Sequence, residues 1–277
     1  MKNIAKGVQL TSFFFWGERM IVTTAGRTNE QMIEKAKQIA DELQIPYIPR
    51  QKRSITAIQQ QMAEHVLVVG KERLEIHLIN GDEPLFFHPN SASFRAKRIL
   101  KGESEPFLQA TKLQRGMTFL DCTLGLAADS IIASLVVGEE GKVVGIEGSS
   151  HIAYLTKQGL RHWESDVVEL NEAMRRIHVH HADFRSFLAQ CDDQSYDVVY
   201  LDPMFEVTID EADGVRGLKQ AALYTNVTAE DIEQAKRVAR QRVVLKDHWQ
   251  SSRFDQFHFF VYRRKTAKFH FGTIELS

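Results

Sequence analysis

The chain has 277 residues, of which 43% are hydrophobic and 26% are charged, and its formal net charge is −1. This length allows one large α/β domain or one domain with a small appended unit, and the composition is typical of globular proteins. No apolar run approaches the ~20 residues that span a bilayer. Because the charges nearly cancel, any affinity for nucleic acid requires a local basic face.

The two cysteines, Cys122 and Cys191, exclude a disulfide framework and a cysteine-based zinc site. We therefore expect two reduced thiols in a cytoplasmic protein. The first 19 residues differ from the rest of the chain, and Gly17-Glu18-Arg19 permits a purine-rich coding stretch that resembles a ribosome-binding site. This suggests that Met20 is the natural start.

Residues 1–90 contain the pattern of a small α/β unit. A strand at 20–25 precedes a helical pattern at 28–43, a short strand at 45–48 and a short helix that begins after Ser54. Two further apolar runs, at 66–70 and 74–79, are separated by a turn and predict a hairpin-like pair. The pattern predicts a separate N-terminal unit.

Residues 91–277 alternate regularly between strand and helix patterns after a polar, basic connection at 91–115. Strands are predicted at 117–122, 142–147, 177–181, 196–201 and 241–246, and helices at 126–137, 150–163, 184–190 and 229–240. Apolar runs at 257–262 and 269–274 predict a terminal hairpin. This order predicts a doubly wound, mostly parallel seven-stranded α/β sheet that ends in an antiparallel hairpin.

The segment Asp121-Cys-Thr-Leu-Gly125 follows the first strand of this sheet. An apolar strand ends in an acid, and a glycine then allows a tight turn into a helix. Ligands of doubly wound sheets bind beyond the carboxyl ends of strands, so Asp121, Thr123 and Gly125 are candidate cofactor contacts. The same turn also occurs in α/β proteins for purely structural reasons.

The next strand ends in Glu147-Gly148, and a carboxylate there can accept hydrogen bonds from both hydroxyls of a ribose. Its alternative role is to interact with the dipole of the following helix. The chain has neither a phosphate-binding loop nor a G-x-G-x-x-G turn, which a diphosphate cofactor would favour. The pattern therefore favours S-adenosylmethionine (SAM), which has no phosphate, over NAD.

The third strand leads into Asp183-Phe184. The Asp183 carboxylate can accept a hydrogen bond from the amino group of adenine, and the Phe184 ring can pack on the adenine ring. Asp183 is equally suited to be a helix N-cap. The same strand carries His178, His180 and His181, but no acid or cysteine lies at ligand spacing, and we predict no metal.

The fourth strand runs into Asp202-Pro-Met-Phe205, which resembles the D/N-P-P-Y/F tetrapeptide of amino-group methyltransferases. The exocyclic amine of a base is a poor nucleophile. Asp202 can accept a hydrogen bond from the N–H of this amine and so orient the nitrogen lone pair. Pro203 fixes the turn and Phe205 can stack on the base, so these three residues are the candidate catalytic group. An ordinary Asp-Pro turn is the structural alternative.

These segments resemble the RsmJ-like small-subunit rRNA (guanine-N2-)methyltransferases of bacteria, over roughly residues 64–276. The similarity includes residues 121–129, 145–147, 198–205 and 242–246. It implies a class I, Rossmann-like methyltransferase that uses SAM to methylate RNA. Its SAM contacts would fall on Ala128, Asp129, Glu147, Gly148, Asp183, Phe184 and Asp202.

The chain departs from that family at several positions. Ala128 replaces an arginine, Glu206 replaces a proline after the tetrapeptide, and the basic tract before the first strand is reduced to Arg95-Ala-Lys-Arg98. These departures leave open a small-molecule or protein substrate, or a non-catalytic nucleotide- or RNA-binding module.

If the substrate is RNA, basic residues should form a rim near Asp202 and bind its phosphates. Salt would weaken that binding. The basic candidates are Arg95, Lys97, Arg98, Lys101, Arg263, Arg264 and Lys265. The long segment 206–226 is a candidate lid.

Overall fold

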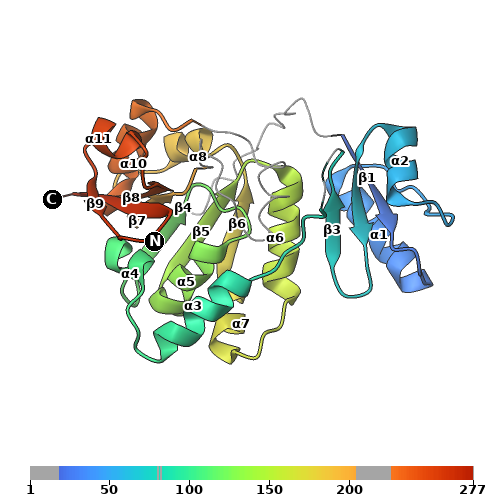
Figure 1. The fold of residues 1–277 in the computed structure, drawn as a ribbon, viewed down its shortest axis with the longest axis horizontal. Helices are drawn as coiled ribbons and strands as arrows, with labels where there is room; N and C mark the ends of the chain where they lie inside the picture. Colours follow the sequence, from blue (N-terminus) through green and yellow to red (C-terminus); the bar gives the residue numbers. More distant parts are fainter. Residues whose placement is uncertain (1–18, 80, 82, 204–225, 277) are drawn as a thin grey trace, which may run out of the picture. The chain divides into compact units, whose positions relative to one another are not determined.

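The computed structural model describes residues 19–79, 81, 83–203 and 226–276. The chain forms two compact units, one running to Lys71 with Ile76–Ile79 and the other containing Glu72–Glu75 and the chain from residue 80 onward (Figure 1). Residues 1–18, Phe205, Glu206 and all of the predicted lid except Asn226 lie outside the described residues. None of the described helices is long and apolar enough to cross a membrane.

The first unit is a three-stranded sheet with helices. Its elements are β1 (Met20–Thr24), α1 (Glu30–Leu43), α2 (Ile55–Met62), β2 (His65–Val69) and β3 (Leu74–His77), with strand order β1-β2-β3. β1 and β2 are parallel, and the strand predicted at 45–48 is reduced to a single bridge between Tyr47 and Val22. Ile21, Ile58 and Val66 form the centre of the core of this unit.

The second unit contains a seven-stranded sheet in the order β6-β5-β4-β7-β8-β10-β9. Its strands are β4 (Thr118–Asp121), β5 (Lys142–Glu147), β6 (Ile177–His181), β7 (Tyr196–Leu201), β8 (Ala239–His248), β9 (Phe260–Tyr262) and β10 (Phe269–Glu275). The five strands from β6 to β8 are parallel, and β10 runs antiparallel to both β8 and β9. The predicted doubly wound sheet with a terminal antiparallel hairpin is confirmed.

Helices surround this sheet. They are α3 (Asn90–Leu100), α4 (Pro106–Thr111), α5 (Ala128–Val137), α6 (Ser150–His162), α7 (Val168–Arg175), α8 (Phe184–Gln190), α10 (Ala229–Val238) and α11 (Arg253–Gln256). The prediction of a polar connection at 91–115 was wrong, because α3 and α4 occupy it. α3 has no side-chain N-cap and buries only the two small residues Ala92 and Ala96, so neither a cap nor large apolar residues marked it as a helix.

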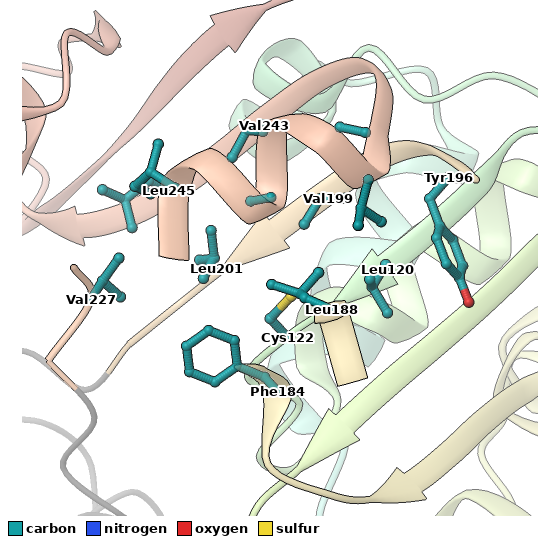
Figure 2. Packing of buried hydrophobic residues seen from close by; sticks show 14 of the residues in the cluster. Leu120, Cys122, Phe184, Leu188, Tyr196, Val199, Leu201, Val227, Val243 and Leu245 are labelled. Carbon is teal, nitrogen blue, oxygen red and sulfur yellow. The ribbon is translucent and has the colours of Figure 1, made fainter. Parts of the chain in front are cut away.

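The core of the second unit continues on both faces of the sheet. On one face, α8 and α10 pack on the central strands, where Phe184, Leu188 and Cys122 lie close to Leu201 (Figure 2). A cluster of aromatic rings joins α4 to the sheet. The centre of the Phe107 ring lies 5.3 Å from that of Tyr200 and 5.8 Å from that of Phe119. This packing fixes the carboxyl ends of β4 and β7, which the candidate site uses.

Candidate functional site

The strand order reverses between β4 and β7, so the turns that follow these two strands meet at one edge of the sheet. Cys122 N–H donates to the Tyr200 carbonyl at 2.9 Å, and Asp202 N–H donates to Thr123 Oγ1 at 2.6 Å. Such a reversal is where ligands bind in doubly wound sheets. The structure therefore brings together Thr123 and Asp202, which the sequence separates by 79 positions.

The turn between β4 and α5 requires unusual backbone conformations. Gly125 has a φ of 51°, and Ala127, which lies at the N-cap of α5, has a φ of 64°. Leu124 packs directly on Gly145 of the neighbouring strand, where a Cβ would lie 2.3 Å from Leu124 Cδ1. The close approach and the left-handed conformations hold the turn tight, with Ala128 partly exposed at the start of α5.

Asp121 is buried beneath this turn. One carboxylate oxygen accepts the Thr123 N–H at 3.0 Å and the other accepts the Ser130 hydroxyl at 2.7 Å. Burial raises the pKa of Asp121 to about 7. The geometry supports a role for Asp121 in shaping the turn, and its predicted contact with the cofactor stays a prediction.

Glu147 joins the turn after β4 to the turn after β5. Its Oε2 accepts the Gly125 N–H at 3.0 Å, and its Oε1 accepts the Ser149 N–H at 2.9 Å. The residue and its neighbour Gly148 are partly exposed, and the Gly148 carbonyl lies 3.1 Å from His181 Nε2. Two backbone donors thus fix the direction of a partly exposed carboxylate at the strand end.

Asp183 caps α8, and its Oδ2 accepts the N–H and the hydroxyl of Ser186 at 2.9 and 3.0 Å. Phe184 is only 6% exposed and lies in the core with Cys122 and Leu188 (Figure 2). The capping role that the sequence offered for Asp183 is therefore present. Contacts of either residue with an adenine stay predictions.

Asp202 is part of an ion-pair network that the sequence analysis missed. Lys246 Nζ lies 2.6 Å from Asp202 Oδ2 and 3.1 Å from Asp129 Oδ2. Asp129 also accepts from Arg95 Nη1 at 2.6 Å and from the Tyr200 hydroxyl at 2.7 Å. The only signal in the sequence was a lysine at the end of the apolar run Arg242-Val-Val-Leu-Lys246.

The two carboxylates that share Lys246 have different environments. Asp129 is buried with three donors, whereas the Asp202 side chain is 26% exposed. Among the described residues, Lys246 is the one side chain that bonds to the Asp202 carboxylate. Pro203, the residue that follows Asp202 in the sequence, is buried, and Phe205 lies outside the described residues.

These environments shift the pKa values in opposite directions. Burial opposes ionisation of Asp129, but Lys246 and Arg95 outweigh it and hold the pKa of Asp129 well below its usual range. Burial raises the pKa of Asp202 to about 6, although the charge of Lys246 acts against it. Burial also opposes the charge of Lys246, but Asp129 and Asp202 raise its pKa. At neutral pH Asp202 is therefore an anion that protonates readily.

The basic residues predicted for a rim are used in different ways. Arg95 is largely buried, with ion pairs to Asp129 and to Glu105 at 2.6 and 2.9 Å, and Arg98 pairs with Glu103 at 2.6 Å. Four of the others are exposed, namely Lys97 on α3, Lys101 just after α3, and Arg263 and Lys265 before β10. Arg95 thus stabilises the edge of the sheet from inside.

His178, His180 and His181 are exposed on β6. Within the described ranges, no group of three or more His, Cys, Asp or Glu side chains is arranged to hold a metal ion.

Comparison with known proteins decides the family. A family profile described as "Putative SAM-dependent methyltransferase" matches residues 50–269. The chain belongs to this family of SAM-dependent methyltransferases. Among relatives, it is 48% identical over 257 residues to the uncharacterized protein YpiP of Bacillus subtilis (strain 168), covering 93% of this chain and 100% of that protein.

More distant relatives agree with this assignment. The chain is 27% identical over 185 residues to ribosomal RNA small subunit methyltransferase J of Legionella pneumophila (strain Philadelphia 1), covering 66% of this chain and 67% of that protein. The crystal structure of the SAM-dependent methyltransferase NGO1261 from Neisseria gonorrhoeae matches with a TM-score of 0.57 and 17% identity, over 92% of this chain and 95% of that chain. The class I methyltransferase fold predicted from the sequence is confirmed, and the cofactor of the family is SAM.

The residues at the edge fit this cofactor. The fixed Glu147 carboxylate suits a ribose diol, and the single-glycine turn at Gly125 does not need to approach a phosphate. The sulfonium group of SAM is positively charged, and the partly exposed carboxylate of Asp202 is complementary to that charge. When bound, SAM supplies an electrophilic methyl group on its sulfonium sulfur.

Proposed function

We propose that this SAM-dependent methyltransferase transfers the methyl group to an exocyclic amine of an RNA base, with Asp202 as the residue that receives the amine. The observation that carries the proposal is the partly exposed Asp202 carboxylate at the point where the strand order reverses, held from behind by Lys246 at 2.6 Å. The cofactor contacts at Thr123, Gly125, Ala128, Glu147 and Gly148 are part of the same proposal.

Asp202 has the charge and position that an amine nucleophile requires. Its carboxylate accepts an N–H of the amine, which orients the nitrogen lone pair toward the methyl group. As the new N–C bond forms and the C–S bond breaks, the nitrogen becomes positively charged, and the Asp202 anion stabilises that charge. The nitrogen then loses a proton to Asp202, whose pKa of about 6 allows it to pass the proton on to water at neutral pH.

Lys246 and Asp129 position this carboxylate. Lys246 fixes Asp202 Oδ2, and Asp129 in turn fixes Lys246 together with Arg95 and Tyr200. A buried cation between two anions restrains both of them, so the Asp202 side chain does not turn freely. Pro203 further limits the backbone after Asp202.

An RNA base is favoured over other amine substrates by two observations. The tetrapeptide Asp202-Pro-Met-Phe205 resembles that of enzymes that methylate the amino groups of bases. The relative from Legionella pneumophila is named for the methylation of small-subunit ribosomal RNA. On this basis the N2 amine of guanine is the first target to test.

The test is methylation of unmodified small-subunit rRNA, offered both as a free transcript and within subunits from a strain that lacks the gene. Nucleosides are analysed by mass spectrometry after incubation with SAM and enzyme. We expect a base-methylated guanosine with the new methyl on N2. Methylation on a ribose oxygen, or no methylated nucleoside from an enzyme that binds SAM, would contradict the proposal.

A further inference from the structure

We propose that Trp249 and the basic turn before β10 form a docking surface for a single-stranded RNA segment that flanks the target base. The inference rests on the proposed RNA substrate and extends it to a second contact site. We name this surface the Trp249 surface, and it consists of Trp249, Arg263 and Lys265.

The pairing of the strands puts these residues on the edge that carries Asp202. β8 is parallel to β7, with Leu245 opposite Leu201, so both strands end at the same edge. β10 is antiparallel to β8, with Phe269 opposite His248, so the turn before Phe269 lies beside the residue after His248. The Trp249 N–H accordingly donates to the Lys268 carbonyl at 3.2 Å.

The turn is strongly basic. Four of the six residues at 263–268 are Lys or Arg, and none is acidic. Arg263, Lys265 and Lys268 are exposed. The exposed side chains of Arg263 and Lys265, at the edge that carries Asp202, attract a phosphate backbone.

Arg264 is the exception, and it stabilises the turn. Its guanidinium lies 4.6 Å from the centre of the Phe269 ring and donates to the Phe269 carbonyl at 2.9 Å. The same ring lies 4.9 Å from Lys246 Nζ. The turn is therefore fixed to the network that holds Asp202.

Trp249 provides the aromatic face that a base can stack on. Its side chain is 51% exposed, although its backbone is fixed between β8 and the basic turn. Exposed indole rings beside basic side chains are typical of surfaces on which unpaired bases stack while the phosphates contact the cations. A base inside a duplex does not offer its face, so the surface favours single-stranded RNA over double-stranded RNA.

The test measures binding, without SAM, of a labelled unstructured oligouridine RNA of about ten nucleotides and of a duplex of the same length. We expect Trp249→Ala to weaken oligouridine binding about 5- to 100-fold and Trp249→Phe to retain most of it, because stacking contributes about 1–3 kcal/mol per base. Phe94→Ala is the matched control, since Phe94 is 67% exposed on α3 outside the surface.

The charges are tested by the dependence of binding on salt. The double variant Arg263→Ala/Lys265→Ala should bind more weakly and lower the slope of log K against log salt by about 1.4, because two phosphate contacts are lost. Arg115→Ala/Lys142→Ala is the control, because these exposed residues lie at or before the amino ends of β4 and β5, the opposite edge of the sheet.

Two results would overturn the inference: oligouridine binding that is the same in Trp249→Ala and in the wild type, or duplex binding that is as tight and as dependent on Trp249. The two proposals can fail separately. If RNA is not methylated but binding depends on Trp249, the proposed function fails and the surface stands. If RNA is methylated without any contribution from Trp249, the surface fails alone.

Discussion

Four acids at the carboxyl edge of the sheet form two contrasting pairs. Asp121 and Asp129, at the β4–α5 corner, are 2% and 7% exposed, and donors of the chain itself occupy their carboxylates. Glu147 and Asp202, at the ends of β5 and β7, are partly exposed. Acidic residues thus have two environments here, since the chain's own donors occupy the buried pair, whereas the partly exposed pair is the one we propose for ligand binding.

The largest expected effect comes from the exposed acid at the end of β7. Asp202→Asn should lower the rate of methyl transfer by about 10²- to 10⁴-fold, because the amide neither stabilises a positive nitrogen nor accepts its proton. Lys246 keeps Asp129 as a partner, so thermal unfolding should change little. Single-turnover transfer from labelled SAM measures the rate, and a variant with full activity would refute the role of Asp202.

The buried acid on the other side of Lys246 should behave in the opposite way. Asp129→Asn leaves Arg95 and Lys246 without their shared anion, which should lower the free energy of unfolding by about 3–5 kcal/mol. Urea denaturation measures this loss. If the variant is as stable as the wild type, Asp129 does not hold the edge together.

The exposed acid at the end of β5 should affect the cofactor. Glu147→Gln should weaken SAM binding about 10- to 100-fold, because hydrogen bonds to a charged acceptor contribute about 1.5–3 kcal/mol. Calorimetric titration with SAM measures this, and Glu169→Gln, which changes an exposed acid of α7, is the control. Equal affinities in the two variants would remove Glu147 from the cofactor site.

The effect expected for Asp121 depends on pH. Its folded pKa of about 7 is above the usual value of 3.8, so between these values the folded state retains a proton that the unfolded state has released. The stabilisation that this proton gives the folded state is present in full below about pH 4. As the pH rises to 7, the free energy of unfolding falls by about 1.4 kcal/mol per pH unit.

Asp121→Asn removes this titration. The stability of the variant relative to the wild type should therefore increase between pH 5 and pH 7 in urea denaturation. A stability difference that is constant over that range would show that Asp121 is ionised at its ordinary pKa.

Local patterns were sufficient to predict most of the second unit. β5, β6, β7 and α8 begin and end at the predicted residues, because apolar strands alternate there with helices and the Asp183 cap marks the start of α8. The turns that carry Asp121, Glu147 and Asp202 follow from the strand ends. By contrast, α3 has no side-chain cap and buries only two alanines, so no cap or run of large apolar residues marked its start.

The network behind Asp202 could not be predicted for a different reason. Lys246 is 117 residues from Asp129, and Arg95 is 34 residues from it, so their contacts depend on the tertiary fold. The sequence presented Arg95 as one of several basic residues suited to RNA. Only the packing of α3 on α5 shows that it pairs with a buried acid.

The most direct test of this account is the pH dependence of single-turnover methyl transfer in the wild type and in Lys246→Met. The wild-type rate should rise with pH to a plateau, with a midpoint near the Asp202 pKa of about 6. Without the lysine charge, the midpoint should move up by about one unit or more, whereas Lys246→Arg should keep it near the wild-type value. Identical midpoints in Lys246→Met and the wild type, with SAM binding intact in both, would contradict the claim that Lys246 controls the charge of Asp202.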